Sequence, residues 1–235
     1  MKSTPKQIEQ RFDREVERFS NLETGQSATI DAPLVLDLIS RAAAATCPQA
    51  RSLLDVGCGA GNYTLKLLEK LPNLDVTLID LSRPMLERAQ ARITPATGGD
   101  VQAVQGDIRE MEFPDGSVDV IVAAAVLHHL RTDAEWQAVF RNFHRWLRPG
   151  GSVWISDLVE HTFQGVQQMM WGRYGDYLAN LKDAAYRDAV FAYLAQEDTP
   201  RSLMFQIDML RRSGFDRIEI LHKNSVFAAF GAVKD

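Results

Sequence analysis

The chain has 235 residues, of which 46% are hydrophobic and 24% are charged, as is typical of a globular protein. This composition excludes a disordered chain, a collagen-like repeat and a small disulfide-stapled protein. Lys and Arg total 26 against 31 Asp and Glu, so the net charge is −5. Because a phosphate backbone attracts basic surfaces, the acidic balance disfavours nucleic acid as a partner.

The N-terminal sequence and the cysteines indicate where we expect the protein to work. No apolar run follows the lysines of MKSTPKQIEQ, and the clearest apolar stretch, Val120 to Leu127, is far shorter than the roughly 20 residues that span a bilayer. The two cysteines, Cys47 and Cys58, are too few for a disulfide framework or a metal-ligand cluster by themselves. We therefore expect a cytoplasmic protein with no membrane segment and no metal site.

Helical patterns open the chain. Apolar residues recur at helical spacing across residues 5–19, and a second helix is predicted from Leu34 to about Thr46. Short apolar runs and helix-forming segments then alternate. The apolar runs are too continuous for a sheet that has one face exposed to solvent, which indicates buried parallel strands. The runs are RSLLDVGC, DVTLIDL, DVQAVQGDI, VDVIVAAAVL and GSVWISDL.

Helix start signals lie between these runs. Ser82 with Pro84 opens one helix, and Thr132 with Glu135 forms a capping box ahead of another. Strands that alternate with helices imply right-handed crossovers, and hence an α/β fold with a doubly wound, mostly parallel sheet.

The pattern changes after the fifth strand. From Val159 to about Gln196 the segments are helical and rich in aromatics, which predicts a helical insertion. Thr199 and Pro200 open a last helix that ends at Gly214. FDRIEIL and SVFAAFGAV then form a closing hairpin, which makes the sheet seven-stranded with an antiparallel last strand.

No linker or repeat divides the chain, so we predict a single domain over residues 1–235. Its parts are N-terminal helices (1–50), a core (51–157), the insertion (158–200), and the last helix with the hairpin (201–235).

The sharpest motif is LLDVGCGAGNYT, in which a buried strand ends near Asp55 and runs into Gly57, Cys58, Gly59 and Gly61 before a helix. Glycines let the backbone turn tightly and approach a ligand closely. The spacing is GxGxG and not the GxGxxG of dinucleotide folds, which weakens a pyrophosphate interpretation. A glycine-rich turn is also common between a strand and a helix without any ligand. Cys58 is interpreted as a small loop residue.

Two further carboxylates end the next two strands. Asp80 is placed where a carboxylate can accept hydrogen bonds from both hydroxyls of a ribose, and Asp107 follows the third strand. With Asp55 they put three acidic residues at successive strand ends, which suits a cationic nucleoside better than an anionic diphosphate.

This combination resembles the class I S-adenosylmethionine-dependent methyltransferases over residues 51–157. DVGCGAG resembles the family's first motif, LIDLS its ribose-binding motif, GDI its adenine-binding motif, and AAAVLHHL the strand and loop beside the methyl group. The resemblance implies S-adenosyl-L-methionine as cofactor. It implies these binding residues: Asp55, Gly57, Cys58, Gly59 and Gly61 for the methionine part, Asp80 for the ribose, Leu81 and Met85 beside the adenine, Asp107 and Ile108 at its edge, and Ala124 at the sulfonium.

The candidate catalytic residues follow the fourth strand. His129 is the candidate general base for a small-molecule acceptor, with Asp157 at the end of the next strand as its partner, as in similar small-molecule enzymes. His128 is the other candidate. The alternative for His128 is a structural role, in which its side chain packs under the loop. Similar enzymes also close an N-terminal lid over the site, which would include Phe12 and Phe19.

The expected function is methyl transfer to a small-molecule acceptor. Two alternatives stay open: an enzyme like the carboxy-S-adenosylmethionine synthases, which the insertion and the tail LRRSGF also resemble, and a cofactor-binding protein without catalysis. The acceptor and the oligomeric state do not follow from the sequence, and a homodimer is one assembly considered.

Overall fold

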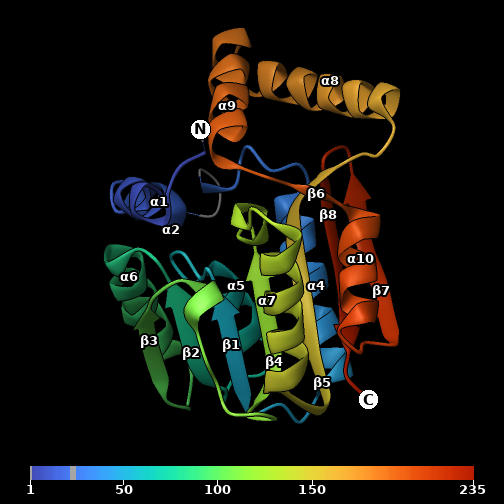
Figure 1. Ribbon diagram of the computed structural model, residues 1–235. Coiled ribbons are helices and arrows are strands. Elements are labelled where there is room, and N and C mark those ends of the chain that lie inside the picture. The colour runs from blue at the N-terminus through green and yellow to red at the C-terminus, as the bar shows by residue number, and fades with distance from the viewer. Residues whose placement is uncertain (1, 22–24) are drawn as a thin grey trace.

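The computed structural model describes residues 2–21 and 25–235. Its centre is one sheet with the order β3-β2-β1-β4-β5-β8-β7, and the two-residue β6 pairs with β5 (Figure 1). The strands are β1 (Ser52–Val56), β2 (Asp75–Asp80), β3 (Val101–Gln105), β4 (Val118–Ala124), β5 (Leu147–Glu160), β6 (Arg201–Ser202), β7 (Arg217–Asn224) and β8 (Phe227–Val233).

The pairing directions confirm the predicted α/β fold. β1, β2, β3, β4 and β5 pair in parallel, whereas β8 runs antiparallel to both β5 and β7. The predicted closing hairpin is therefore present. Its turn includes Ser225, which has a φ of 50°.

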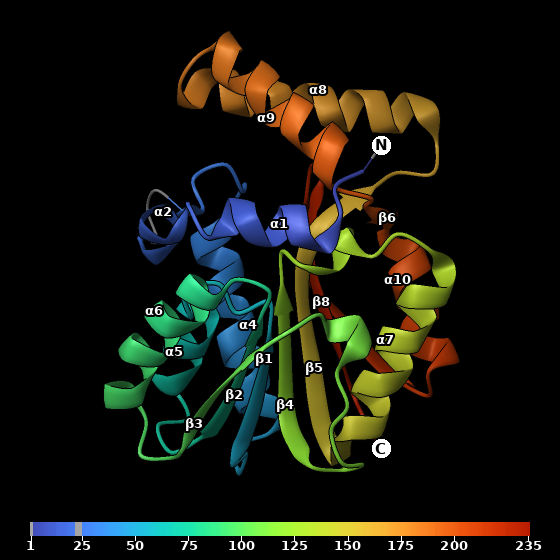
Figure 2. The same ribbon diagram turned by 60° about the vertical axis from the view of Figure 1, so that its left-hand side comes forward.

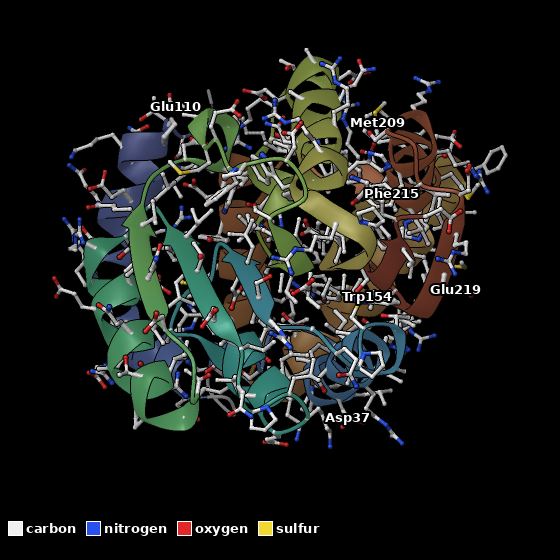
Figure 3. All side chains as sticks on the ribbon, turned by 90° about the horizontal axis from the view of Figure 1, so that it is seen from below. Asp37, Glu110, Trp154, Met209, Phe215 and Glu219 are labelled. Atoms are coloured by element: carbon white, nitrogen blue, oxygen red, sulfur yellow. The ribbon has the colours of Figure 1, made fainter. Side chains whose placement is uncertain are left out.

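Helices lie on both faces of the sheet and above its carboxyl edge. They are α1 (Pro5–Phe12), α2 (Val16–Ser20), α4 (Ala32–Thr46), α5 (Asn62–Leu68), α6 (Arg83–Ile93), α7 (Asp133–Trp146), α8 (Gln164–Leu181), α9 (Ala184–Glu197) and α10 (Leu203–Arg212), with short 3-10 turns η1 (Thr94–Ala96), η2 (Ile108–Glu110) and η3 (Leu127–His129). One apolar layer joins the sheet to α4, α5 and α6, and a second joins it to α7 and α10. Figure 3 shows Trp154 on the α4 side, and Met209 and Phe215 on the α10 side.

The predicted helix caps hold. The Ser82 side chain accepts a hydrogen bond from the Met85 N–H at the start of α6. Thr132 and Glu135 form the reciprocal capping box of α7. Such caps satisfy backbone donors that a helix start leaves free, so these start points are encoded locally.

Two helix predictions are wrong in their bounds. The pattern over residues 5–19 is split into α1 and α2, with the break at residues 13–15. The last helix begins at Leu203 and not at Thr199, because residues 201–202 pair with β5 as β6 and Ser202 provides the N-cap.

The N-terminal helices and the insertion lie at the carboxyl edge of the parallel strands. α1 crosses above the ends of β1 and β4, and the α8–α9 hairpin lies above α1 (Figure 2). Tyr174 and Leu178 of α8 are buried together with Val226 of the closing hairpin. The edge where open α/β sheets bind ligands is thus covered by two segments far apart in sequence.

In the described part of the chain, none of the helices combines the length and the apolar character that crossing a bilayer requires.

Candidate active site

Strand pairing brings the predicted motifs to one place. Val56 pairs with Ile79 of β2 and with Ala123 of β4, and Asp80 pairs with Gln105 of β3. The loops that follow these four strands therefore start side by side at the carboxyl edge. They line one cavity under α1.

Nearly all predicted cofactor residues line this cavity. They are Asp55, Gly57, Cys58, Gly59, Asp80, Leu81, Met85, Asp107, Ile108 and Ala124. Gly61 is the exception, because it caps α5 with a φ of 83° and packs against Ile93. A Cβ on Gly61 would come within 2.6 Å of the Ile93 Cδ1, so the structure assigns this glycine to helix packing.

The glycine turn provides a close approach to the cavity at one position. Gly57 and Gly59 have φ angles of 65° and 50°. A Cβ on Gly57 would lie 2.6 Å from the Val126 Cγ2, whereas a Cβ on Gly59 would meet no atom within 4 Å. Gly59 therefore leaves open space where a ligand can contact the backbone.

This difference gives a first prediction. Gly59→Ala puts a methyl group into free space with a tolerable left-handed φ, so we expect a stability loss of only about 1 kcal/mol. We expect a larger loss, of about tenfold or more, in affinity for S-adenosylhomocysteine measured by calorimetry. Gly61→Ala is the matched variant: it should lower the midpoint of thermal unfolding more than Gly59→Ala does. Equal effects of both variants on binding and on unfolding would contradict this assignment.

Of the first two strand-end carboxylates, Asp55 is buried and Asp80 is half-buried. Asp55 is 2% exposed, and its Oδ2 accepts a hydrogen bond of 2.6 Å from the Thr64 hydroxyl. Burial, together with the charge of Asp80, raises the pKa of Asp55 to about 6 despite the bond from Thr64. The pKa of Asp80 is likewise raised by burial.

Asp80 also organises the loops around it. Its Oδ2 accepts a hydrogen bond of 2.8 Å from the Gly59 N–H, and its Oδ1 accepts one of 2.9 Å from the Ser82 N–H. The carboxylate thus links the glycine turn after β1 to the start of α6. It holds two loops of the cavity in register.

The third carboxylate is engaged by a neighbour that the sequence analysis did not single out. Asp107 Oδ1 accepts hydrogen bonds from the Arg109 N–H and from Arg109 Nε, at 3.0 and 2.9 Å. Arg109 Nη1 also contacts Glu135 at 2.9 Å. Burial would raise the pKa of Asp107, but these bonds outweigh it and lower that pKa. Among the described residues that line the cavity, Arg109 is the one Lys or Arg side chain, and its charge is already paired.

The expected pairing of His129 with Asp157 is wrong. Asp157 is buried at the end of β5 and binds His128: its Oδ1 contacts His128 Nδ1, and its Oδ2 accepts a hydrogen bond of 3.0 Å from the His128 N–H. Burial lowers the pKa of His128, but the carboxylates of Asp157 and Asp198 outweigh burial and raise it to about 9. Neither His128 nor Asp157 lines the cavity, so this buried pair lies outside its wall.

His129 lines the cavity, and its partner comes from a segment that sequence reasoning missed. Its Nδ1 lies 3.6 Å from Oδ1 of Asp198, which directly follows α9. Burial, followed by the nearby charges of His128, Arg131 and Arg11, lowers the pKa of His129 well below its ordinary value. No local motif marks Asp198, because only the folded insertion carries it to the loop after β4.

The N-terminal helices close the cavity from above. Ile8, Phe12 and Phe19 line it, and the Phe12 ring meets the His129 ring edge-on at 6.3 Å between centroids. Arg11 forms a 2.8 Å ion pair with Glu197 at the end of α9. The expected cover over the site is therefore built by the N-terminal helices, and the ion pair with Glu197 ties α1 to α9 of the insertion.

The strand order, the glycine turn and the acidic cavity agree with the resemblance to class I S-adenosylmethionine-dependent methyltransferases that the sequence motifs indicate. Residues 53–151 match the family described as a methyltransferase domain. This match covers the core of the sheet from β1 to the first residues of β5.

Curated relatives match the same region. Malonyl-[acyl-carrier protein] O-methyltransferase of Halalkalibacterium halodurans is 37% identical over 118 residues, which is 49% of this chain and 42% of that protein. Demethylmenaquinone methyltransferase of Listeria monocytogenes is 29% identical over 119 residues, 50% of this chain and 49% of that protein. The chain thus spans about half the length of the curated relatives it matches.

A solved structure extends the likeness to nearly the whole chain. N-methyltransferase NodS from Bradyrhizobium japonicum, in complex with S-adenosyl-L-homocysteine, has a TM-score of 0.66, covering 96% of this chain and 97% of that one. The identity is 16%, so this likeness concerns the fold alone.

Proposed function

We propose that the protein binds S-adenosylmethionine in the cavity at the strand edge and transfers its methyl group to a small-molecule acceptor. The observation that carries the proposal is the pair of carboxylates, the buried Asp55 and the half-buried Asp80, in a cavity whose arginine is neutralised. Two such groups favour a ligand with fixed positive charge and disfavour a diphosphate. The cofactor meets that need, since its bound form supplies a sulfonium-activated methyl group.

The chain's own residues would act by holding and orienting the two reactants. In this proposal Asp80 accepts hydrogen bonds from the ribose hydroxyls, and Asp55 attracts the charged methionine part near Gly59. Leu81, Met85, Asp107 and Ile108 would enclose the adenine. Alignment in an enclosed cavity accounts for much of the rate of such a reaction, because the donor is already activated.

His129 is proposed to act at the acceptor end of the cavity. Ala124 and His129 line the same space, and the depressed pKa of His129 keeps its imidazole neutral at pH 7. A neutral imidazole there has a lone pair that can accept a proton or bind another electron-pair acceptor. His128 and Asp157 are proposed as positioning residues that fix the backbone on which His129 sits.

Acceptors named for the relatives guide the choice of a first panel. The relatives' names give a malonyl group on an acyl carrier protein and demethylmenaquinone as acceptors. Turnover is tested by mass spectrometry with these classes and with small amines. Formation of S-adenosylhomocysteine together with a methylated acceptor supports the proposal, and a modified cofactor would favour the carboxy-S-adenosylmethionine synthase alternative.

The raised pKa of Asp55 gives a second prediction. If the carboxylate must be ionised to attract the α-ammonium group of the amino-acid part, which S-adenosylhomocysteine shares with the cofactor, binding loses strength as pH falls through about 6. We expect affinity for S-adenosylhomocysteine to be flat above pH 7 and about tenfold weaker at pH 5. Calorimetry across this range measures it. Asp55→Asn should bind weakly at every pH, and a variant that keeps the slope would assign the titration to another group.

A further inference from the structure

Three side chains, His128, His129 and Asp198, converge beside the cavity that His129 lines. His128 Nε2 lies 3.6 Å from Asp198 Oδ1, and His129 Nδ1 lies 3.6 Å from the same oxygen. All three ligand atoms lie within 4.8 Å of one another. Among residues 2–21 and 25–235, this is the only group of three histidine, cysteine or acidic side chains so arranged.

Two of these atoms are buried without a hydrogen bond. His129 Nδ1 and Asp198 Oδ1 are shielded from solvent and have no hydrogen-bond partner, and Asp198 is 3% exposed. A buried polar atom left alone costs roughly 1–3 kcal/mol. The carboxylate oxygen is an acceptor, and the neutral imidazole of His129 offers a lone pair. His128 offers one at Nε2 once a metal ion displaces its proton, so the cluster suits a shared electron-pair acceptor.

We propose that His128 Nε2, His129 Nδ1 and Asp198 Oδ1 form a site for a divalent first-row transition metal ion. Two imidazoles and one carboxylate are the ligand set of catalytic zinc sites, with the fourth position left open. Ligands about 2.0 Å from a tetrahedral ion lie roughly 3.3 Å apart, so the two 3.6 Å separations need only small side-chain rotations.

The surroundings support this site in two ways. Asp157 contacts Nδ1 of His128, and a metal-bound histidine usually has such a carboxylate or carbonyl on its other ring nitrogen. The backbone also joins the ligand segments, since the Thr199 N–H donates to the His128 carbonyl at 2.7 Å.

The local charge balance also permits a cation. The carboxylates of Asp157, Asp198 and Glu197 face the cluster against the guanidinium groups of Arg11 and Arg131, and a metal ion that displaces the His128 proton would take the place of one local positive charge. Arg11 is itself paired with Glu197.

The position of the site gives it a function. His129 lines the proposed cofactor cavity, and Asp198 lines a second hollow together with Trp171 of α8 and Lys2. A metal ion held by His129 and Asp198 would lie between the two hollows. Its free coordination position would be available to an oxygen or nitrogen of the acceptor. This departs from the expectation of no metal site, which rested on the small number of cysteines.

The test is a titration of chelator-treated, full-length protein with Zn²⁺ by calorimetry, and with Co²⁺ by visible absorption. We expect one equivalent to bind, with visible bands typical of four- or five-coordinate Co²⁺. Asp198→Asn and His129→Ala should weaken binding at least about tenfold, and Asp157→Asn by about 10–100-fold. Affinity for S-adenosylhomocysteine reports that each variant is folded, and it does not depend on the metal.

His161→Ala is the matched control, because His161 lies outside the cluster and contacts Gln167 and Lys223. It should leave metal binding unchanged. Absence of binding to the folded protein, or equal loss in the control and the cluster variants, would overturn the proposal. Because metal binding is measured without cofactor or acceptor, its failure would leave methyl transfer standing, and the reverse also holds.

Discussion

Asp80→Ala is expected to weaken binding of S-adenosylhomocysteine by at least about 100-fold. In the proposed complex the substitution removes two charge-assisted hydrogen bonds to the ribose, each worth about 1.5–3 kcal/mol. It also removes the bonds that Asp80 accepts from the Gly59 and Ser82 N–H groups. Calorimetry measures the affinity, and thermal unfolding reports whether the loops still fold.

Two variants separate these contributions. Asp80→Asn keeps an acceptor for the loops but loses the charge, so it should bind better than Asp80→Ala and worse than the wild type. Glu87→Ala removes an exposed carboxylate of the neighbouring helix α6 and should bind normally. Wild-type affinity in a folded Asp80→Ala protein would remove this carboxylate from the site.

His129→Ala is expected to lower turnover by about 10²–10⁴-fold while cofactor affinity stays nearly unchanged. The side chain lies at the acceptor end of the cavity, with Phe12 against its ring and Asp198 beside its Nδ1. Its removal takes away the lone pair that faces the acceptor, and it leaves the carboxylates of the cofactor cavity in place. Steady-state kinetics with a saturating acceptor measure the loss.

The second histidine provides the comparison. His128→Asn keeps a polar side chain beneath the loop but loses the pairing with Asp157 and the ring near Asp198. Because His128 does not line the cavity, its effect on turnover should come with a loss of thermal stability, whereas His129→Ala should change turnover more than stability. A small loss of turnover in His129→Ala would show that alignment alone drives the reaction.

The parts of the fold that local sequence encodes were predictable. Buried strand runs, the caps at Ser82 and Thr132, and the glycine turn each depend on neighbouring residues, and the parallel order follows from their alternation with helices. The break between α1 and α2 was not predictable from apolar spacing, because that spacing continues across it. The start of α10 was missed because β6 forms only by pairing with a distant strand.

The same distinction applies to the site. Strand-end carboxylates could be located because parallel strands end at one edge, which is a property of the fold class. The sequence could not show that Asp157 pairs with His128 and not with His129, because the two adjacent histidines have no feature that distinguishes them. Asp198 reaches them only through the folded α8–α9 hairpin, so the most unusual part of the site depends on tertiary structure.

The central claim is that this cavity binds S-adenosylmethionine for methyl transfer to a small molecule. The most direct measurement is mass spectrometry of reactions with methyl-deuterated S-adenosylmethionine and the acceptor panel, for the wild type and Asp80→Ala. The account predicts that wild-type protein produces S-adenosylhomocysteine and an acceptor carrying the deuterated methyl group, and that Asp80→Ala does so far more slowly. Label that stays on the nucleoside, or an unlabelled acceptor despite cofactor binding, would contradict it.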